Sequence, residues 1–398
     1  HIHCIDSRSL GSGGIPCFPI YRNDSLSREV LYEPKTMNRD YDSIRPYTDQ
    51  ETSEALKRVA GAPELSAIST FLFGPGKDRE EALRSLLRST DTIDGFQAKV
   101  MAGVIRSILQ KTSTSLEIKG LEYVEDGRKH VLMSNHRDII LDPAIMQLIL
   151  FDNKVSTTEI AVGDNLIASS LIEDIFRSNR MIKVVRGGNP REKYMASALL
   201  SSYMRDNISS GRCSVWIAQK GGRAKDGLDN TSQGVLKMLD MSGTGDFVQD
   251  FLEISVLPFA ISYQFEPCDF LKARELYVSR RGQYVKQPGE DTHSILTGVT
   301  QAKGGIAFHF CPALSSEDIA SCASQGKNDR FKALAYLLDT RIQSNYRLWD
   351  TNYIAFDIME NGTSHASLYT DEARRFFIGR MEKGLSAIVE KDPDMDKD

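Results

Sequence analysis

The first part of the chain, up to about residue 115, carries apolar residues at the spacing of amphipathic helices. The clearest segments are 53–59, 78–87 and 95–110, and a Gly-Pro-Gly triplet at 74–76 separates two of them. Strand-like runs are few, so the pattern predicts a helical region. The stretch 96–109 is compatible with a membrane-surface helix, but we favour core packing for it.

From about residue 120, short apolar runs alternate with segments of helical length. The runs cover 131–133, 159–162, 181–185, 214–218, 254–263 and 305–310, and helices are expected near 143–151, 165–178, 190–208 and 229–240. Two of these helices open with a capping residue before proline, at Asp142-Pro143 and Asn189-Pro190. The alternation predicts an α/β fold: a mainly parallel sheet flanked by helices, with an N-terminal helical region.

These patterns divide the chain into four segments. Residues 1–40 contain a glycine-rich stretch and no apolar signal-peptide core, so we expect a flexible extension. Residues 41–115 form the helical region and 116–385 the α/β domain. The acidic segment 386–398 is expected to be a disordered tail. No apolar run reaches about 18 residues, so no transmembrane helix is expected.

Charge is distributed unevenly along the 398 residues. The net charge of −5 argues against a general nucleic-acid binder, so no nucleic-acid partner is expected. Residues 177–225, however, hold eleven basic and two acidic residues, which is about +9 against about −14 for the rest. Solvated helix faces would explain this segment, and so would an anionic partner such as phosphate, coenzyme A or anionic lipid. The six cysteines form no CxxC or zinc-like pattern, so no metal site is expected.

Polar and glycine-rich segments follow three of the predicted strands. They are 134–138 with Asp142 beyond it, 186–188 and 219–227. Ligands of α/β sheets bind beyond the carboxyl ends of the strands, so these segments should lie around one site. The first segment contains His136, with Asp138 and Asp142 as nearby carboxylates.

A histidine that faces arginine- and glycine-rich loops suits acyl transfer to a phosphorylated alcohol. A neutral imidazole takes the hydroxyl proton, and a carboxylate fixes its tautomer. Arginines and free backbone N–H groups hold a phosphate. Each residue also has a plain structural explanation: His136 as a structural histidine, Asp142 as a helix N-cap and the glycine pairs as turns. The order of these residues along the chain and their shared placement after strands favour an acyl-transfer site over the structural explanations.

Four blocks along the chain resemble those of the glycerolipid acyltransferases, which include the glycerol-3-phosphate and 1-acylglycerol-3-phosphate acyltransferases. The blocks are Asn135-His136 with Asp142-Pro143, 181–187 (MIKVVRG), 216–227 (WIAQKGGRAKDG) and 256–263 (VLPFAISY). Residues 41–49 and 266–276 are also similar to a soluble bacterial branch of the 1-acylglycerol-3-phosphate acyltransferases. The resemblance covers roughly residues 41–350.

Two positions depart from the family blocks. The family has four residues between its histidine and aspartate, whereas five separate His136 from Asp142 and one separates it from Asp138. We favour Asp142 as the partner because proline follows it, and Asp138 is the alternative. Where the third block carries a glutamate that helps to position the acceptor, this chain has Gly221. A catalytically silent lipid- or phosphate-binding homologue is therefore a second interpretation.

The resemblance implies a mechanism without cofactor or acyl-enzyme. His136 would act as general base while the acceptor hydroxyl attacks the thioester of acyl-CoA or acyl carrier protein. Arg186, Gly222, Arg223 and Lys225 would bind the acceptor phosphate. The expected product is phosphatidic acid from 1-acylglycerol-3-phosphate, in phospholipid synthesis, with glycerol-3-phosphate as the alternative acceptor. We expect a cytoplasmic protein held peripherally on the anionic inner face of the membrane.

Overall fold

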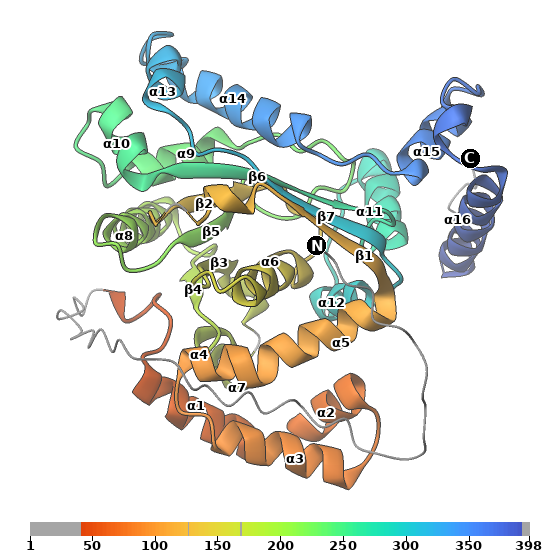
Figure 1. The fold of residues 1–398 in the computed structure, drawn as a ribbon, viewed down its shortest axis with the longest axis horizontal. Helices are drawn as coiled ribbons and strands as arrows, with labels where there is room; N and C mark the ends of the chain where they lie inside the picture. Colours follow the sequence, from red (N-terminus) through yellow and green to blue (C-terminus); the bar gives the residue numbers. More distant parts are fainter. Residues whose placement is uncertain (1–40, 126, 168, 392–398) are drawn as a thin grey trace. The chain divides into compact units, whose positions relative to one another are not determined.

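The computed structural model describes residues 41–125, 127–167 and 169–391 (Figure 1). The predicted extension 1–40 and the last residues of the predicted acidic tail, 392–398, lie outside these residues. All described residues belong to one compact unit.

A seven-stranded sheet is at the centre of the described fold, in the order β1-β7-β6-β2-β5-β3-β4. Strands β2 to β6 run parallel to one another; β7 is antiparallel to β6, and β1 is parallel to β7. The predicted α/β fold with a mainly parallel sheet is confirmed. The strand bounds are β1 Ser113–Lys119, β2 Val131–Ser134, β3 Glu159–Gly163, β4 Met181–Val184, β5 Val215–Ala218, β6 Val256–Tyr263 and β7 Gly304–Phe310.

Each of the six predicted strands is present, and β1 is the strand that the pattern did not predict. Its sequence, STSLEIK, is mostly polar, and the strand is half-buried at the edge of the sheet. Only Leu116 and Ile118 give it apolar alternation. Pairing with the fully buried β7 therefore determines its conformation more than its own sequence does.

The predicted N-terminal helical region is present. Its elements are α1 Asp49–Gly61, α2 Leu65–Phe73, α3 Lys77–Arg88, α4 Ile93–Phe96, the π-helical turn η2 Gln97–Met101 and α5 Ala102–Thr112. Phe96, Val100, Ile105 and Ile108 are buried, which confirms core packing for the stretch 96–109. Helix α2 was not predicted, because LSAISTFLF is too apolar to show a helical stripe.

Alternate residues of β2 face two hydrophobic cores. Leu132 packs in a core with α5 and α6, whereas Val131 and Met133 pack with α8, α10 and α14 on the other face (Figure 1). The remaining helices are α6 Leu141–Asp152, α7 Ser170–Arg177, α8 Pro190–Ser209, α9 Gln233–Asp240, α10 Phe247–Ile254, α11 Asp269–Arg281, α12 Glu290–Thr300, α13 Ser316–Ala323, α14 Arg330–Ser344, α15 Asp350–Met359 and α16 Asp371–Lys391, with short 3₁₀ turns η3 Leu121–Tyr123, η4 Asp164–Leu166 and η5 Ala366–Leu368.

One of the two predicted helix caps is confirmed and the other is wrong. The Asn189 side chain accepts hydrogen bonds from the first backbone N–H groups of α8. Helix α6 begins one residue before Asp142, which therefore lies inside the first turn. The N-cap position is Ile140, which makes no side-chain cap, and Asp138 Oδ1 accepts from the N–H groups of Ile140 and Leu141 just before the helix. The carboxylate of Asp142 is thus available for other contacts.

Helix α16 continues to Lys391, so residues 386–391 of the predicted tail are helical. Ile388 is buried, and an apolar anchor of this kind extends the helix into the acidic segment. Across the described ranges, no helix combines the length and apolar character needed to cross a bilayer.

Candidate active site

His136 and Asp142 are in direct contact just beyond the carboxyl end of β2. The His136 Nδ1 atom lies 2.8 Å from Asp142 Oδ2. The same Oδ2 accepts from the backbone N–H groups of Arg137 (2.6 Å) and Asp138 (2.9 Å), and Oδ1 accepts from the Tyr263 hydroxyl (2.8 Å). One oxygen of this fully buried carboxylate thus bonds to the loop that carries the histidine, and the other bonds to the end of β6.

These contacts keep Asp142 ionised. Burial by itself raises the pKa of Asp142, but the hydrogen bond and positive charge of His136 and the backbone donors of Asp138 and Arg137 outweigh it, so the pKa lies below its ordinary value. An ionised carboxylate at Nδ1 accepts a hydrogen bond, which places the proton on Nδ1. The lone pair of Nε2 is then the basic position of the imidazole.

The Nε2 atom of His136 has no hydrogen-bond partner among the residues that the structure describes. The His136 side chain is 14% exposed, and its ring meets Trp216 edge-on with 5.6 Å between centroids. Trp216 comes from β5 and donates its indole N–H to Ser134. The ring of His136 is thus held from one side while one nitrogen remains open.

Asp138, the alternative partner, does not contact His136. Its Oδ1 accepts the two backbone bonds at the start of α6, and its Oδ2 is buried without a partner. Burial, followed by the charge of Asp142, raises the pKa of Asp138 above its ordinary value. Gly298 of α12 packs against Oδ2, where a Cβ atom would overlap it. The geometry therefore associates Asp142 with the histidine and Asp138 with the loop.

Asn135, which precedes the histidine, fixes the loop to the neighbouring strand. Its Nδ2 donates to the Ile261 carbonyl, and the Ile261 N–H donates to its Oδ1, both at 2.8 Å. The buried Arg137 on the other side of His136 forms an ion pair with Asp229. His136 is thus flanked by two buried anchors.

Sequence reasoning missed several residues of this buried network. Tyr263 belongs to the recognised fourth block, and a hydroxyl at the end of an otherwise apolar strand was the available signal. Lys272 donates to the Arg137 carbonyl (2.7 Å) and to Glu266 (2.6 Å). Both residues lie in the stretch 266–276, whose similarity to the soluble bacterial branch was noted without assigning roles.

Arg186 extends from the end of β4 across β3 toward the loop after β5. A Cβ atom on Gly221 would lie 3.2 Å from Arg186 Nη1, and one on Gly163 would overlap its Nε. The side chain is exposed and makes no hydrogen bond or ion pair within the described parts of the chain. Gly221 has an ordinary backbone conformation, whereas Gly222 has a φ of +82°. The turn thus requires glycine at 222 rather than at 221.

The loop after β5 is bonded to the loop that carries the histidine. Ala224 N–H donates to the His136 carbonyl at 3.0 Å, which places Gly222 and Arg223 beside it. Arg223 is half-buried, its Nη1 has no described partner, and its positive charge acts on Asp138. Lys225 is instead paired with Glu275 of α11 at 2.5 Å. The structure therefore brings His136, Asp142, Arg186, Gly222 and Arg223 to one edge, and Lys225 toward α11.

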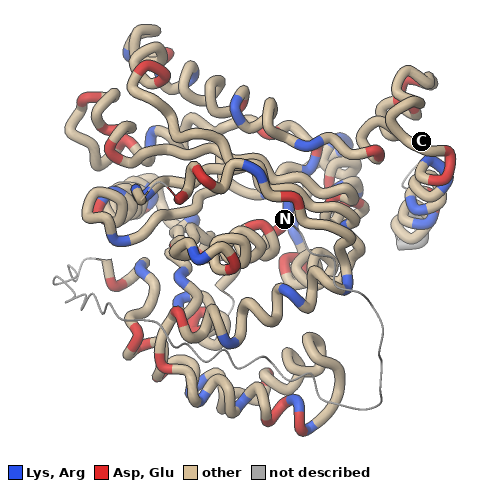
Figure 2. The backbone as a smooth tube through the Cα atoms, viewed as in Figure 1, with Lys and Arg blue, Asp and Glu red and all other residues tan. Residues whose placement is uncertain are grey.

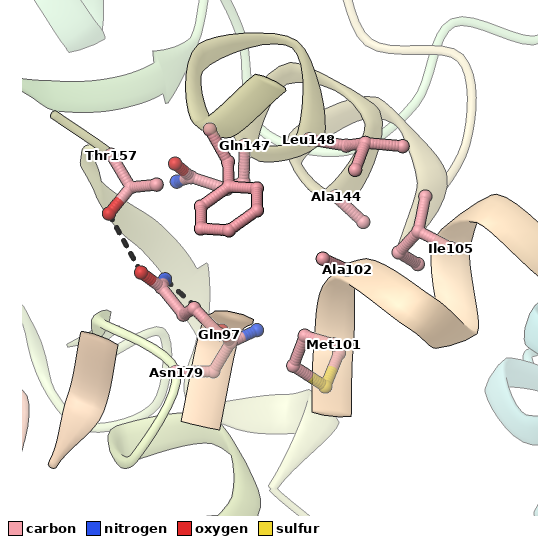
Figure 3. A pocket seen from close by; sticks show the side chains of 10 residues that line it. Gln97, Met101, Ala102, Ile105, Ala144, Gln147, Leu148, Thr157 and Asn179 are labelled. Carbon is pink, nitrogen blue, oxygen red and sulfur yellow. Dashed lines mark hydrogen bonds between the residues drawn. The ribbon is translucent and has the colours of Figure 1, made fainter. Parts of the chain in front are cut away.

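One cavity lies between η2–α5 and α6 (Figure 3). Gln97 closes one end, donating to Asn179 (3.2 Å) and accepting from Thr157 (2.7 Å). Ala144 and Leu148 line the cavity from a face of α6 roughly 200–240° around the helix from Asp142. This cavity is therefore separate from the reacting groups.

A second cavity, of about 180 Å³, lies between α2, α5 and α12. It is lined by Phe71, Leu72, Phe73, Val104, Ser107, Ile108, Lys111, Thr112, Val299 and Thr300. Gly298, next to Val299, contacts Asp138 of the loop that carries the histidine. The cavity thus shares a wall with the candidate site, and most of its lining is apolar.

No cluster of three or more His, Cys, Asp or Glu residues in the described ranges is arranged to hold a metal ion. The four described cysteines, Cys213, Cys268, Cys311 and Cys322, are buried and free.

The site belongs to a recognisable class. A buried, ionised carboxylate that orients a histidine with one open nitrogen is typical of enzymes in which imidazole acts as general base. Residues 115–262 match the family model described as Acyltransferase. This part of the chain, which contains His136 and Asp142, is thus similar to the acyltransferase family.

A solved structure similar to this chain is that of the 1-acyl-sn-glycerophosphate (LPA) acyltransferase PlsC from Thermotoga maritima. The identity is 10% over 74% of this chain and 94% of that one, with a TM-score of 0.37. No curated protein matches the sequence.

Proposed function

We propose that this acyltransferase moves a fatty acyl group from a thioester donor to the free hydroxyl of 1-acylglycerol-3-phosphate, giving phosphatidic acid in phospholipid synthesis. The contact between His136 and Asp142, beside two arginines without carboxylate partners, is the observation that carries the proposal. A lone lipid-binding site has no need of an oriented, ionised carboxylate behind a histidine.

In the proposed reaction, His136 Nε2 removes the proton of the acceptor hydroxyl as the oxygen attacks the thioester carbonyl. The ester C–O bond forms, the C–S bond breaks, and the imidazolium returns its proton to the departing thiolate. Asp142 stabilises the imidazolium between the two transfers. General-base catalysis of this kind contributes about 10²–10⁴-fold in rate.

Arg186 and Arg223 bind the acceptor phosphate in this proposal, with the exposed backbone of Gly222 between them. The exposed Arg186 guanidinium makes no hydrogen bond to a described residue, which suits bidentate contact with phosphate oxygens, whereas Arg223 is half-buried and its unpartnered Nη1 atom is buried. Lys225 contributes less, because Glu275 already compensates its charge. Asp138 holds the start of α6 and does not take part in proton transfer.

The cavity between α2, α5 and α12 is the proposed site for the acyl chain. Its volume and apolar walls suit a hydrocarbon segment, and its wall at α12 adjoins the loop that carries the histidine. The donor is acyl-CoA or acyl carrier protein, both of which present a thioester and a phosphorylated carrier arm. We further propose that the protein acts at the cytoplasmic, inner face of the membrane, held there peripherally through its basic segment.

Competition between two acceptors tests this function. Purified protein is given an acyl thioester with equal concentrations of 1-acylglycerol-3-phosphate and glycerol-3-phosphate, and the products are identified by mass spectrometry. We expect phosphatidic acid to predominate. The donor carries an acyl chain of a different length from that of the added 1-acylglycerol-3-phosphate. Lysophosphatidic acid with the donor's chain as the main product would select glycerol-3-phosphate as the acceptor, and no acylated product from either would indicate the silent homologue.

A further inference from the structure

We infer that the β4–α8 loop, the first turns of α8 and the tip of the β5–α9 loop form a surface that docks on an anionic lipid bilayer. This docking surface comprises Val185, Arg186, Arg191, Lys193, Tyr194, Met195 and Leu228. It deepens the proposed function, since it would present the site to membrane lipid, but the evidence for it is independent of the catalytic groups.

The start of α8 projects from the described fold. Every residue from 185 to 195 is exposed, including Tyr194 at 64% and Met195 at 61%. Farther along the same helix, Leu200, Tyr203 and Met204 are buried in the core. Because α8 packs with its second half only, its first turns have no apolar partner in the described protein.

Large apolar side chains gather on this edge. Arg191, Tyr194 and Met195 have the i, i+3, i+4 spacing of one helix face. Val185 (39% exposed) is the first residue of the β4–α8 loop, and Leu228 (62% exposed) lies in the neighbouring β5–α9 loop. The close approach of Arg186 to Gly221 shows that the two loops are adjacent. Exposed apolar residues surrounded by charge are typical of interaction surfaces.

The basic residues of the docking surface are uncompensated, unlike most others in the segment 177–225. Arg180 pairs with Asp94, and Arg205 is buried against Glu253. The side chains of Arg186, Arg191 and Lys193 form no ion pair within the described residues. The adjacent Glu192 is used by the α8 cap, where it accepts from the Asn189 N–H. The positions of basic and acidic residues can be followed in Figure 2.

This combination favours a bilayer as the partner. Lys and Arg are attracted to an anionic leaflet, while a tyrosine and aliphatic side chains enter the interfacial layer. Arg186, a member of this surface, is also proposed to bind the acceptor phosphate, so docking would bring this arginine to the level of the lipid headgroups.

Vesicle flotation with the full chain tests the inference. The vesicles contain phosphatidylcholine alone or phosphatidylcholine mixed with phosphatidylglycerol, at low and at high salt. We expect binding to the mixed vesicles that weakens with salt. Because each basic residue strengthens binding to an anionic leaflet, Arg191→Gln/Lys193→Gln should weaken it on the order of 30-fold. Tyr194→Ser/Met195→Ser should weaken it further at high salt, where apolar contact remains.

The matched control is Tyr336→Ser/Met359→Ser, which removes side chains of the same types that are 74% and 80% exposed on α14 and α15. This control should bind vesicles as the wild type does, and all variants should keep wild-type thermal stability. Transfer to a short-chain, water-soluble acceptor should be unchanged in every variant, which separates docking from the proposed reaction. Wild-type protein that ignores anionic vesicles, or α8 variants that bind like the control, would overturn the inference. The inference would also be overturned if the α8 variants bound vesicles normally but lost binding to an acidic carrier protein. That result would assign the surface to a protein partner.

Discussion

The two sides of the candidate site differ in how fully they are bonded. The loop after β2 is buried and held by many hydrogen bonds: Asp142 accepts from His136, Tyr263 and two backbone N–H groups, and Asn135 pairs with β6. The loops after β4 and β5 are exposed, and Arg186 has no described partner. In the proposed reaction, the group that moves a proton is therefore fixed in advance, whereas Arg186, which is proposed to bind the substrate phosphate, has no partner among the described residues. This is the division expected when the substrate supplies the missing charge.

Removing the fixed base should have the largest effect. His136→Ala should lower kcat by about 10²–10⁴-fold, because the acceptor hydroxyl then has no proton acceptor. His136 is a loop residue in partial contact with solvent, so thermal unfolding should change little. Steady-state kinetics together with a melting curve measure both quantities, and near-wild-type turnover would remove His136 from the mechanism.

Substitution of the two aspartates should lower kcat to different extents, because only Asp142 contacts His136. Asp142→Asn removes the charge that holds the proton on Nδ1, and we expect kcat to fall about 10²-fold. Asp138→Asn keeps an oxygen for the N–H groups at the start of α6 and should change kcat much less. Kinetics of the matched pair measure this difference. A larger loss for Asp138→Asn would make it the partner of His136.

Asp142 also gives a dependence of stability on pH. Its folded-state pKa lies below the ordinary value, so its ionised form stabilises the fold at pH above about 3.9, and that stabilisation is lost as pH falls through the folded pKa. Asp142→Asn lacks this contribution at any pH. As the pH falls below about 3.9, the melting temperatures of the two proteins should therefore converge, whereas an unchanged gap would exclude the linkage.

Substitutions in the loops after β4 and β5 should weaken binding of the acceptor. A hydrogen bond to a charged group contributes about 1.5–3 kcal/mol, so Arg186→Gln and Arg223→Gln should each lower kcat/KM about tenfold to a hundredfold for a phosphorylated acceptor. An unphosphorylated monoacylglycerol should be affected little. Equal losses for both acceptors would show that the arginines do not bind phosphate.

Substitution of Gly221 should have the smallest effect on the kinetics. A glutamate there would grow from a Cβ that lies 3.2 Å from Arg186 Nη1 and would compete with the substrate for this arginine. An exposed ion pair is worth up to about 1 kcal/mol, so Gly221→Glu should raise KM about twofold to fivefold, and Gly221→Ala should not. A lower KM in Gly221→Glu would instead make the glycine a missing acceptor contact.

Sequence patterns were sufficient for the buried strands and for His136 with Asp142, because fully apolar runs and the family blocks depend on local sequence. Sequence patterns failed where contacts with residues distant in the sequence determine the local structure. Strand β1 is specified by β7, and the N–H groups at the start of α6 donate to Asp138 rather than to Asp142. The approach of Arg186 to Gly221 and the pairing of Lys225 with Glu275 join residues from separate elements, which no local pattern contains.

The most direct test of the central claim is the release of thiol from an acyl thioester by the wild-type enzyme, with and without 1-acylglycerol-3-phosphate. Direct attack by an acceptor that His136 deprotonates predicts thiol release that requires the acceptor, equals the phosphatidic acid formed and shows no initial burst. A burst of thiol without acceptor would reveal an acyl-enzyme and contradict the mechanism. Acceptor present but no thiol released would contradict the assignment of acyl transfer to this site.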